Sequence, residues 1–263
     1  MELPRLGFGT YRLTAPDRCR TAVRTALETG YRHVDTAEYY GNQASVGDGI
    51  AASDIARDDV FLASKVWRDR LDHDDFLASA RERVDLLGVD TLDLLYVHWP
   101  LGTYDPEETL PALVEARERG LTRRIGLSNV TPALPDEAID HLDELPAAHQ
   151  VEMHPLLPQE ELRAHADRHG YSLVAYAPIA RNAVADVPEI RQVTEKHDAT
   201  PAQVSLAWAL EKDVAVIPKA GTPAHVRENY GALEVALDAE DIARIDAIDR
   251  EERLVDVPEA PWN

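Results

Sequence analysis

The stretch Gly30-Tyr31-Arg32-His33-Val34-Asp35-Thr36-Ala37-Glu38-Tyr39-Tyr40-Gly41-Asn42 contains a pattern that recurs along the chain. A glycine ends a helical pattern, and a short apolar run then leads into a loop with an acid and two tyrosines. Glycine just past a helix relieves the strain of a left-handed cap, so it is a physical stop signal. The same succession of helix, glycine and apolar run recurs at Gly88, Gly120 and Gly170.

Eight apolar runs are strand candidates, and helical patterns lie between them. They cover residues 6–10, 31–34, 60–64, 92–97, 122–127, 149–152, 171–176 and 214–217. Thr200 is expected to cap a helix that begins at Pro201, and Asp238 to cap a helix that runs to Asp249. Strands that alternate with helices pair in parallel through right-handed crossovers. Eight such units favour a closed (β/α)₈ TIM barrel, a single α/β domain over residues 1–263.

An open, doubly wound parallel sheet is the alternative fold for this alternation. Its usual signature is a G-x-G-x-x-G stretch after an early strand, and Gly7-Phe8-Gly9 is not continued by the third glycine. With 263 residues, 44% of them hydrophobic, the chain has the size of one barrel domain. The single cysteine, Cys19, lies in a helical pattern and is expected to be an inert thiol.

Charge and hydropathy exclude several classes of function. The net charge of −21 argues against binding to nucleic acid or to anionic membranes, because both need a basic face. No apolar run approaches the roughly 20 residues that span a bilayer. Residues 1–5 contain no basic region followed by a long apolar stretch, so we expect no signal peptide and a cytoplasmic protein.

The basic residues are nearly all arginines. The sequence has only four lysines, Lys65, Lys196, Lys212 and Lys219. We interpret an acidic, lysine-poor surface as an adaptation to high salt, where screening weakens the repulsion between like charges. The composition therefore predicts a halophilic origin and says nothing about the substrate.

Polar, reactive side chains lie at the ends of the apolar runs in unit after unit. They are Asp35, Lys65, His98, Ser128, Asn129, Gln150, Tyr176 and Lys219. A single lysine or histidine at a strand end is usually an ordinary structural residue. In a barrel, however, all these ends meet at one mouth, where active sites are built. Their joint alignment therefore predicts a site at that mouth.

Six motifs in this order resemble the signatures of the aldo-keto reductase superfamily, over nearly the whole chain. They are Gly30–Ala37 with Tyr40-Gly41-Asn42, Ala63–Trp67, Leu92–Pro100, Ile125–Asn129, Gln150–Pro155 and Ile217–Lys219. The resemblance implies an oxidoreductase that reduces an aldehyde or ketone to the alcohol with NAD(P)H as the hydride donor.

The resemblance implies a catalytic tetrad of Asp35, Tyr40, Lys65 and His98. Hydride addition to a carbonyl makes an alkoxide, and Tyr40 is the expected acid that protonates it. The ammonium of Lys65 is expected to lower the pKa of Tyr40 from its ordinary value of about 10. Asp35 would hold Lys65 charged and oriented, and His98 would hydrogen-bond the carbonyl oxygen. Tyr39 is assigned to packing, because the family spacing places the acid five residues after Asp35.

The resemblance also implies a site for the nicotinamide end of the cofactor. Ser128, Asn129 and Gln150 match the partners of the nicotinamide carboxamide. Tyr176 matches the ring on which nicotinamide stacks. Thr10 is expected to approach the ribose. No metal ligand is implied.

A second segment matches the family's site for the adenosine phosphate. Its matching residues are Lys219, Ala220, Gly221, His225, Glu228 and Asn229. Thr222 and Pro223 are expected to start a helix whose N-terminus offers donors to an anion. Ala220 replaces the usual serine and His225 the usual arginine. A neutral histidine cannot form the bidentate hydrogen bonds that arginine makes to a phosphate. NADPH is still favoured because Lys219 and Arg227 are nearby, with NADH or dual use as the alternatives.

Within the family, the chain is most similar to the short 2,5-diketogluconate and methylglyoxal reductases of bacteria. This likeness lies at the two ends of the chain, residues 6–13 and 253–262. The short loop 100–106 and the short tail after Asp249 predict an open, shallow site for small dicarbonyls or sugar-derived carbonyls. Three aromatic residues are expected to line it, with packing at the rim as the alternative: Tyr11, Trp67 and Trp99.

Two other classes of function remain as alternatives. A regulatory or redox-sensing protein on this barrel would bind the cofactor with little turnover, but the intact tetrad weighs against it. A metal-dependent barrel hydrolase would use His98, His149 and His154, but no HxH or HExxH spacing supports it. We expect a monomer that acts on a small-molecule carbonyl, with neither nucleic acid nor membrane as a partner.

Overall fold

One parallel sheet contains all eight strands in chain order. The strands are β1 Phe8–Gly9, β2 His33–Asp35, β3 Phe61–Val66, β4 Leu94–Val97, β5 Ile125–Ser128, β6 Ala148–Glu152, β7 Ser172–Tyr176 and β8 Ala215–Val216. This computed structural model describes residues 2–131, 133–142 and 145–263. Each predicted strand is therefore present, although β1 and β8 are shorter than their apolar runs.

The sheet closes on itself between its first and last strands. Leu6 pairs in parallel with Val216, and Gly9 with Lys219. The N–H of Gly9 donates to the carbonyl of Pro218 at 3.1 Å. A Cβ at Gly9 would lie 2.6 Å from the carbonyl oxygen of Ile217, so only glycine permits this close approach. The closed (β/α)₈ barrel is confirmed, and the open sheet is excluded.

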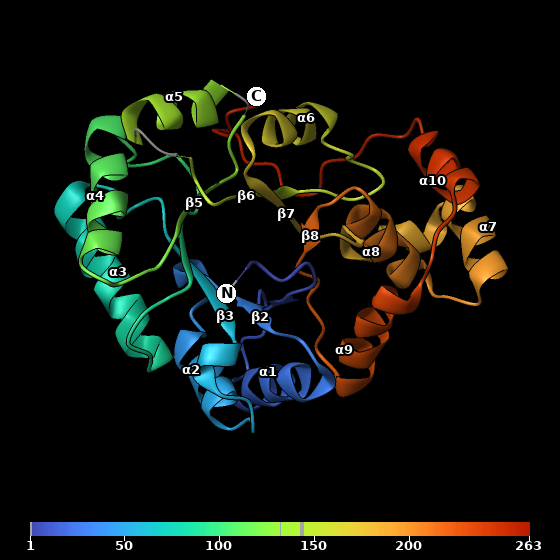
Figure 1. Ribbon diagram of the computed structural model, residues 1–263, viewed down its shortest axis with the longest axis horizontal. Helices are drawn as coiled ribbons and strands as arrows, with labels where there is room; N and C mark the ends of the chain where they lie inside the picture. Colours follow the sequence, from blue (N-terminus) through green and yellow to red (C-terminus); the bar gives the residue numbers. More distant parts are fainter. Residues whose placement is uncertain (1, 132, 143–144) are drawn as a thin grey trace.

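Helices surround the barrel on the outside (Figure 1). They are α1 Pro16–Thr29, α2 Gln43–Ala51, α3 His73–Leu87, α4 Pro106–Glu118, α5 Ala133–Leu142, α6 Glu160–His169, α7 Pro188–His197, α8 Pro201–Glu211, α9 Pro223–Tyr230 and α10 Ala239–Asp246. Short 3₁₀ helices occur at η1 Glu38–Tyr40, η2 Arg57–Asp59, η3 Ala180–Asp186 and η4 Gly231–Glu234. Among the described residues, no helix is both long and apolar enough to cross a bilayer.

The predicted helix boundaries are mostly correct. The glycines that end four of the helices all have positive φ: Gly30, Gly88, Gly120 and Gly170. Of these, Gly88 and Gly170 adopt the left-handed cap conformation. The capping boxes at Thr200 and Asp238 are both formed. The prediction that the last helix runs to Asp249 is wrong, because α10 ends at Asp246.

The barrel interior and the space between barrel and helices hold two separate apolar clusters. The interior cluster contains Phe61, Ala63, Leu94, Tyr96, Ala148, Val174, Ala215 and Ile217. The larger cluster, which includes Leu62, Leu95 and Val216, packs the outer face of the sheet against the helices. Successive side chains on a strand point to opposite faces, so every second residue enters the barrel.

Candidate active site

Strand alternation explains why polar side chains gather at one mouth of the barrel. Phe61 and Ala63 of β3 point inward, so Lys65 continues the same face at the carboxyl end of the strand. By the same rule Gln150 follows Ala148 on β6, and Tyr176 follows Val174 on β7. Lys65 and Gln150 lie within their strands, whereas Asp35, Ser128 and Tyr176 are the last residues of theirs.

A buried ion pair forms the base of this mouth. Nζ of Lys65 lies 2.5 Å from Oδ1 of Asp35, and the two side chains are 0% and 1% exposed. The ammonium also donates to the carbonyl of Thr36 at 2.9 Å. The second carboxylate oxygen of Asp35 accepts from Nε2 of Gln150 at 2.8 Å. Burial lowers the pKa of Lys65, and the adjacent Asp35 carboxylate opposes that effect.

Tyr40 lies beside this pair. Nζ of Lys65 is 5.4 Å from the centre of the Tyr40 ring, which also contacts His98 at 5.9 Å and Tyr11 at 5.1 Å. Burial raises the pKa of Tyr40 well above its ordinary value, and the negative charge of Asp35 raises it further. The expected lowering of this pKa by Lys65 is therefore wrong for the protein without ligand. The ammonium is bonded to Asp35, and Tyr40 remains a protonated phenol.

His98 presents a neutral imidazole to the same space. Its side chain is buried, and its Nδ1 has no hydrogen-bond partner among the described residues. Burial lowers the pKa of His98 well below its ordinary value, and the charge of Lys65 adds to this effect. A neutral imidazole can donate one N–H to a carbonyl oxygen without carrying a charge.

Glu38 fixes the turn that carries Tyr40, a role that the sequence motifs did not indicate. Its carboxylate accepts from the backbone N–H of Trp67 at 2.8 Å and from the hydroxyl of Ser79 at 3.0 Å. It also forms an ion pair with Arg83 at 3.1 Å. These bonds attach η1 to β3 and α3. An acid placed directly before two tyrosines was the only signal in the sequence.

The expected partners of nicotinamide form one hydrogen-bonded group. The side-chain amide of Asn129 donates to Ser128 Oγ at 3.1 Å and accepts from the Tyr176 hydroxyl at 2.7 Å. Asn129 adopts a φ of 60°, a left-handed conformation that asparagine tolerates better than most residues. Gln150 joins this group through its backbone carbonyl, which accepts from the N–H of Asn129 at 3.0 Å, while its side chain donates to Asp35. Thr10 is fully buried, and its hydroxyl donates to the Asp35 carbonyl at 3.0 Å.

Positive charge gathers at the expected adenosine-phosphate end, in a protein with a net charge of −21. Burial lowers the pKa of Lys219, and the nearby charges of Arg18 and Arg12 lower it further. Arg18 also donates to the Gly221 carbonyl at 2.8 Å. Thr222 caps α9 by accepting from the N–H of His225 at 3.3 Å. Sequence reasoning missed Arg12 and Arg18, because no motif marks them.

The other residues expected at this end differ in their exposure. Ala220 and Asn229 are buried, whereas His225 is exposed. Glu228 is partly buried, and its carbonyl accepts from Nε2 of Gln203 at 2.9 Å. His225 is therefore the one of these four that is most open to solvent.

Aromatic rings form the rim around the mouth. Trp67 contacts His98 at 5.1 Å and stacks on Tyr39 at 4.2 Å. Tyr39, assigned to packing from the sequence, is 56% exposed and extends this rim. Trp99 is buried, and its ring lies 5.5 Å from Trp262 in the C-terminal tail. Tyr11 and Trp67 thus lie next to the predicted tetrad, whereas Trp99 packs against the tail.

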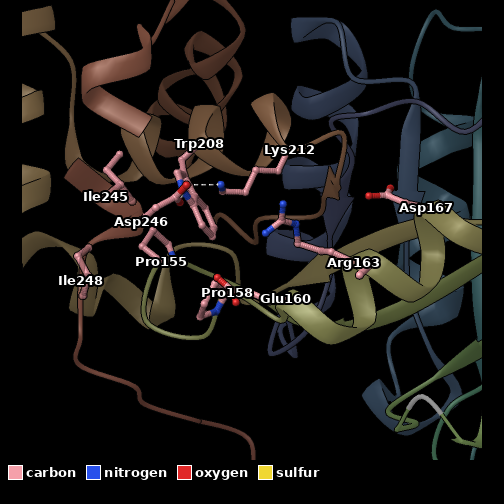
Figure 2. A pocket seen from close by; sticks show the side chains of 11 residues that line it. Pro155, Pro158, Glu160, Arg163, Asp167, Trp208, Lys212, Ile245, Asp246 and Ile248 are labelled. Carbon is pink, nitrogen blue, oxygen red and sulfur yellow. Dashed lines mark hydrogen bonds and ion pairs between the residues drawn. The ribbon is translucent and has the colours of Figure 1, made fainter. Parts of the chain in front are cut away.

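Two cavities lie away from this mouth. One of about 300 Å³ lies between the start of α6, the end of α8, and α10 (Figure 2). Lys212 forms part of its wall and lies 2.7 Å from Asp246. The other, of about 510 Å³, extends to Leu3 and to the first residues of β7 and β8. No residue of the predicted tetrad lines either cavity.

A sequence profile of the Aldo/keto reductase family matches residues 5–250. The chain belongs to the aldo/keto reductase family. This aldo-keto reductase is 39% identical over 258 residues to the methylglyoxal reductase DkgB of Escherichia coli O157:H7, covering 97% of this chain and 96% of the relative. It is 38% identical over 262 residues to DkgB of Salmonella typhi, covering 97% and 96%.

Solved structures give the same assignment. This reductase matches a putative 2,5-diketo-D-gluconic acid reductase B with a TM-score of 0.93 and 38% identity, over 98% of this chain and 92% of the other. A mutant of Gox0644 in complex with NADPH matches with a TM-score of 0.89 and 32% identity, over 99% and 94%. The chain is thus an oxidoreductase, and a related structure binds NADPH.

Proposed function

We propose that this aldo-keto reductase reduces a small dicarbonyl or sugar-derived carbonyl to the alcohol, with Tyr40 as the proton donor. The observation that carries the proposal is the buried ion pair of Lys65 and Asp35 beside two neutral donors, Tyr40 and His98. A protonated phenol and a neutral imidazole at one mouth suit a reaction in which a carbonyl oxygen gains negative charge.

Each residue has a distinct task in this proposal. The nicotinamide cofactor supplies the hydride. His98 donates a hydrogen bond to the carbonyl oxygen, and Tyr40 transfers its phenolic proton to that oxygen as charge develops there. The ammonium of Lys65 then faces the phenolate, and Asp35 keeps the ammonium charged and in place. For transfer of the proton, the relevant pKa of Tyr40 is therefore the one that applies during the reaction, when the alkoxide develops and the phenolate faces Lys65.

The residues present fit a phosphorylated nicotinamide cofactor. Lys219, Arg18 and Arg12 bring three positive charges together beside the N-terminus of α9, where backbone N–H groups favour an anion. Two of these residues are arginines, which offset the loss of the usual arginine at His225. We therefore favour NADPH, with NADH or dual use as the alternatives.

The substrate class rests on the relatives and on the rim. Proteins named methylglyoxal reductase are 38–39% identical to this chain. Tyr11 is 37% exposed beside Tyr40, so the mouth is open to small polar carbonyls. Methylglyoxal, 2,5-diketogluconate and aldoses are the substrates to test first.

Replacing the acid tests the chemistry. Tyr40→Phe should lower kcat by about 10²–10⁴-fold, because it removes the transferable proton. Cofactor affinity, measured by quenching of tryptophan fluorescence, should change little. Tyr39→Phe is the matched control and should keep its activity. Near-normal turnover in Tyr40→Phe would show that another group is the acid, whereas a wild type that oxidises NADPH with none of these carbonyls would favour the regulatory alternative.

Cofactor choice is tested at His225. Wild type should bind NADPH more tightly than NADH, and His225→Arg should widen that preference by about tenfold, since a charge-assisted hydrogen bond is worth roughly 1.5–3 kcal/mol. Titrations at one ionic strength measure it. Arg18→Ala should narrow the preference for NADPH over NADH, because it removes one of the positive charges at this end. A preference that neither substitution moves would place the 2′-phosphate elsewhere.

A further inference from the structure

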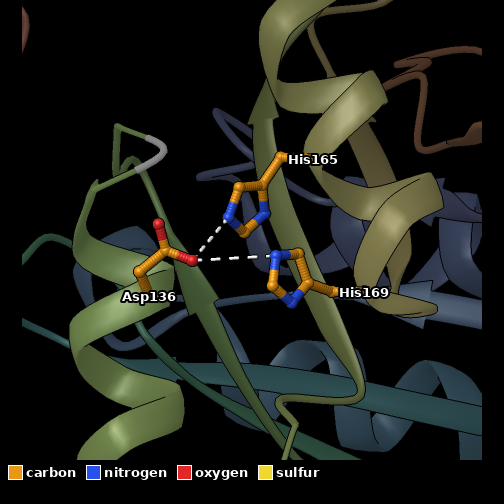
Figure 3. A group of neighbouring side chains, drawn as sticks. All are labelled: Asp136, His165 and His169. Atoms are coloured by element: carbon orange, nitrogen blue, oxygen red, sulfur yellow. Dashed lines mark hydrogen bonds and ion pairs between the residues drawn. The ribbon is translucent and has the colours of Figure 1, made fainter.

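A cluster on the outer helices lies apart from the barrel mouth. Asp136 comes from α5, and His165 and His169 come from α6 (Figure 3). Two residues four apart lie on the same face of a helix, and the two imidazole rings stack with centres 4.3 Å apart and planes at 19°. Each residue offers one ligand atom, and these atoms all lie within 4.8 Å of one another.

Both imidazoles aim the same atom at one carboxylate oxygen. Nε2 of His165 lies 3.0 Å and Nε2 of His169 3.7 Å from Oδ1 of Asp136. Ligand atoms at about 2.0–2.1 Å from a tetrahedral Zn²⁺ are roughly 3.4 Å apart. The two separations from Asp136 lie on either side of this value, and the three ligand atoms all lie within 4.8 Å of one another, so small side-chain movements would bring them around one ion.

Tyr171 orients the imidazole of His165, which is the more deeply buried of the two rings. Its hydroxyl lies 2.7 Å from Nδ1 of His165, which is 3% exposed. Histidines that bind metals usually donate their other ring N–H to an oxygen in this way, which orients the ring and leaves the lone pair of Nε2 free for the ion.

Both imidazoles face the single carboxylate of Asp136. Two stacked imidazolium rings would repel each other at this distance, whereas two neutral rings can share one cation through their Nε2 lone pairs. A cation held by the two imidazoles and the carboxylate is compatible with the whole arrangement. Two nitrogen ligands favour zinc and its neighbours over Mg²⁺ or Ca²⁺, which prefer oxygen.

We propose that Asp136, His165 and His169 bind a Zn²⁺-type divalent cation, with water as the fourth ligand. The ion would tie α5 to α6 on the outside of the barrel. The site is independent of the proposed carbonyl reduction, because it shares no residue with the barrel mouth.

Calorimetric titration of the chelator-treated full chain with Zn²⁺ tests the site. Wild type should bind one ion and gain a Tm shift of several degrees at saturating Zn²⁺. His169→Ala and Asp136→Asn should each weaken binding by at least about tenfold and remove that shift. Both residues are partly or fully exposed, so these variants should fold, whereas His165 is buried and is left intact.

His73→Ala is the matched control. His73 also lies beside two carboxylates, Asp74 at 3.2 Å and Glu115 at 3.0 Å, but no second imidazole among the described residues forms a metal-binding group with it. This variant should bind Zn²⁺ as wild type does. Co²⁺ should give the visible absorption of tetrahedral coordination in wild type and in His73→Ala only. No binding in wild type, or equal binding in all four proteins, would overturn the proposal.

Discussion

Histidines buried in a neutral form make the protein sensitive to acid. Burial lowers the pKa of His149 to about 3, with the neighbouring His165 adding to the effect, and burial lowers that of His33 to about 4. In the unfolded chain both should titrate near 6.5. Because the folded pKa is depressed, the unfolded state takes up the proton first as the pH falls. The stability is therefore complete above about pH 6.5 and is lost progressively below it.

His149→Gln should reduce this loss of stability at low pH, because it removes one of the two groups that take up a proton on unfolding. Between about pH 6 and pH 4, the free energy of unfolding should fall less steeply with pH than in wild type, by about 1.4 kcal/mol per pH unit. Glutamine keeps an acceptor for the backbone N–H of Val130, which lies 3.4 Å from Nε2 of His149. Urea unfolding at a series of pH values measures the slope. His73→Gln, at a partly exposed site, should run parallel to wild type, and a parallel His149→Gln would contradict the assignment.

At the scale of residues, the sequence was most informative where spacing along one strand decides the outcome. The positions of Lys65 and Gln150 follow from alternation, and the structure brings both to Asp35. Glu38 and Arg18 could not be predicted in the same way, since their partners come from distant segments. The direction of the pKa shift of Tyr40 also depends on burial, which no motif encodes.

The C-terminal tail is an element whose position depends on one buried acid. Glu152, at the end of β6, accepts from His154 at 3.0 Å and from the backbone N–H groups of Leu254 and Val255 at 2.7 and 2.8 Å. Burial by itself raises the pKa of Glu152, but these hydrogen bonds reverse the effect and hold it below its ordinary value. The carboxylate thereby anchors the tail to the barrel.

Glu152→Ala should release this tail. Two backbone donors and His154 lose their acceptor, so local opening should become easier, at a cost of about 1–3 kcal/mol for each group left buried and unpaired. Limited proteolysis with mass spectrometry should detect faster cleavage beyond residue 250. Glu251→Ala changes an exposed acid on the same tail and should leave the rate unchanged. Equal rates in both variants would show that contacts such as Trp99 with Trp262 hold the tail without Glu152.

At the scale of elements, capping residues and glycines predicted where the helices begin and end. The sequence predicted less well how the elements pack against one another. Capping residues and glycines located most helix ends, because those signals act within one turn. The tail was expected to be short and to leave the mouth open. The tail also forms contacts of its own: Trp262 packs on Trp99, and Arg68 lies 3.8 Å from Glu259. The tail is attached to the barrel because Glu152, at the end of β6, accepts hydrogen bonds from it. The tail's own sequence does not reveal this acceptor.

The net charge acts on the molecule as a whole. With a charge of −21, mutual repulsion should lower stability at low ionic strength, and screening should relieve it as the Debye length falls from about 10 Å at 0.1 M to about 3 Å at 1 M salt. The Tm should therefore rise with KCl over this range. Surface pairs such as Lys196 with Asp238 have the opposite, smaller dependence. A Tm that is indifferent to salt or falls would contradict the proposed adaptation to high salt.

The scarcity of lysine has a practical consequence for labelling. Three of the four lysines are held by carboxylates: Lys65 by Asp35, Lys196 by Asp238 and Asp241, and Lys212 by Asp246. Lys219 instead faces Arg18 and Arg12, and its lowered pKa leaves more of the amine in the nucleophilic free-base form. Acylating dyes, cross-linkers and amine-reactive supports should therefore select this lysine over the other three. Attachment there would occupy the end of the barrel where we place the adenosine phosphate, so immobilisation through amines would compete with the cofactor.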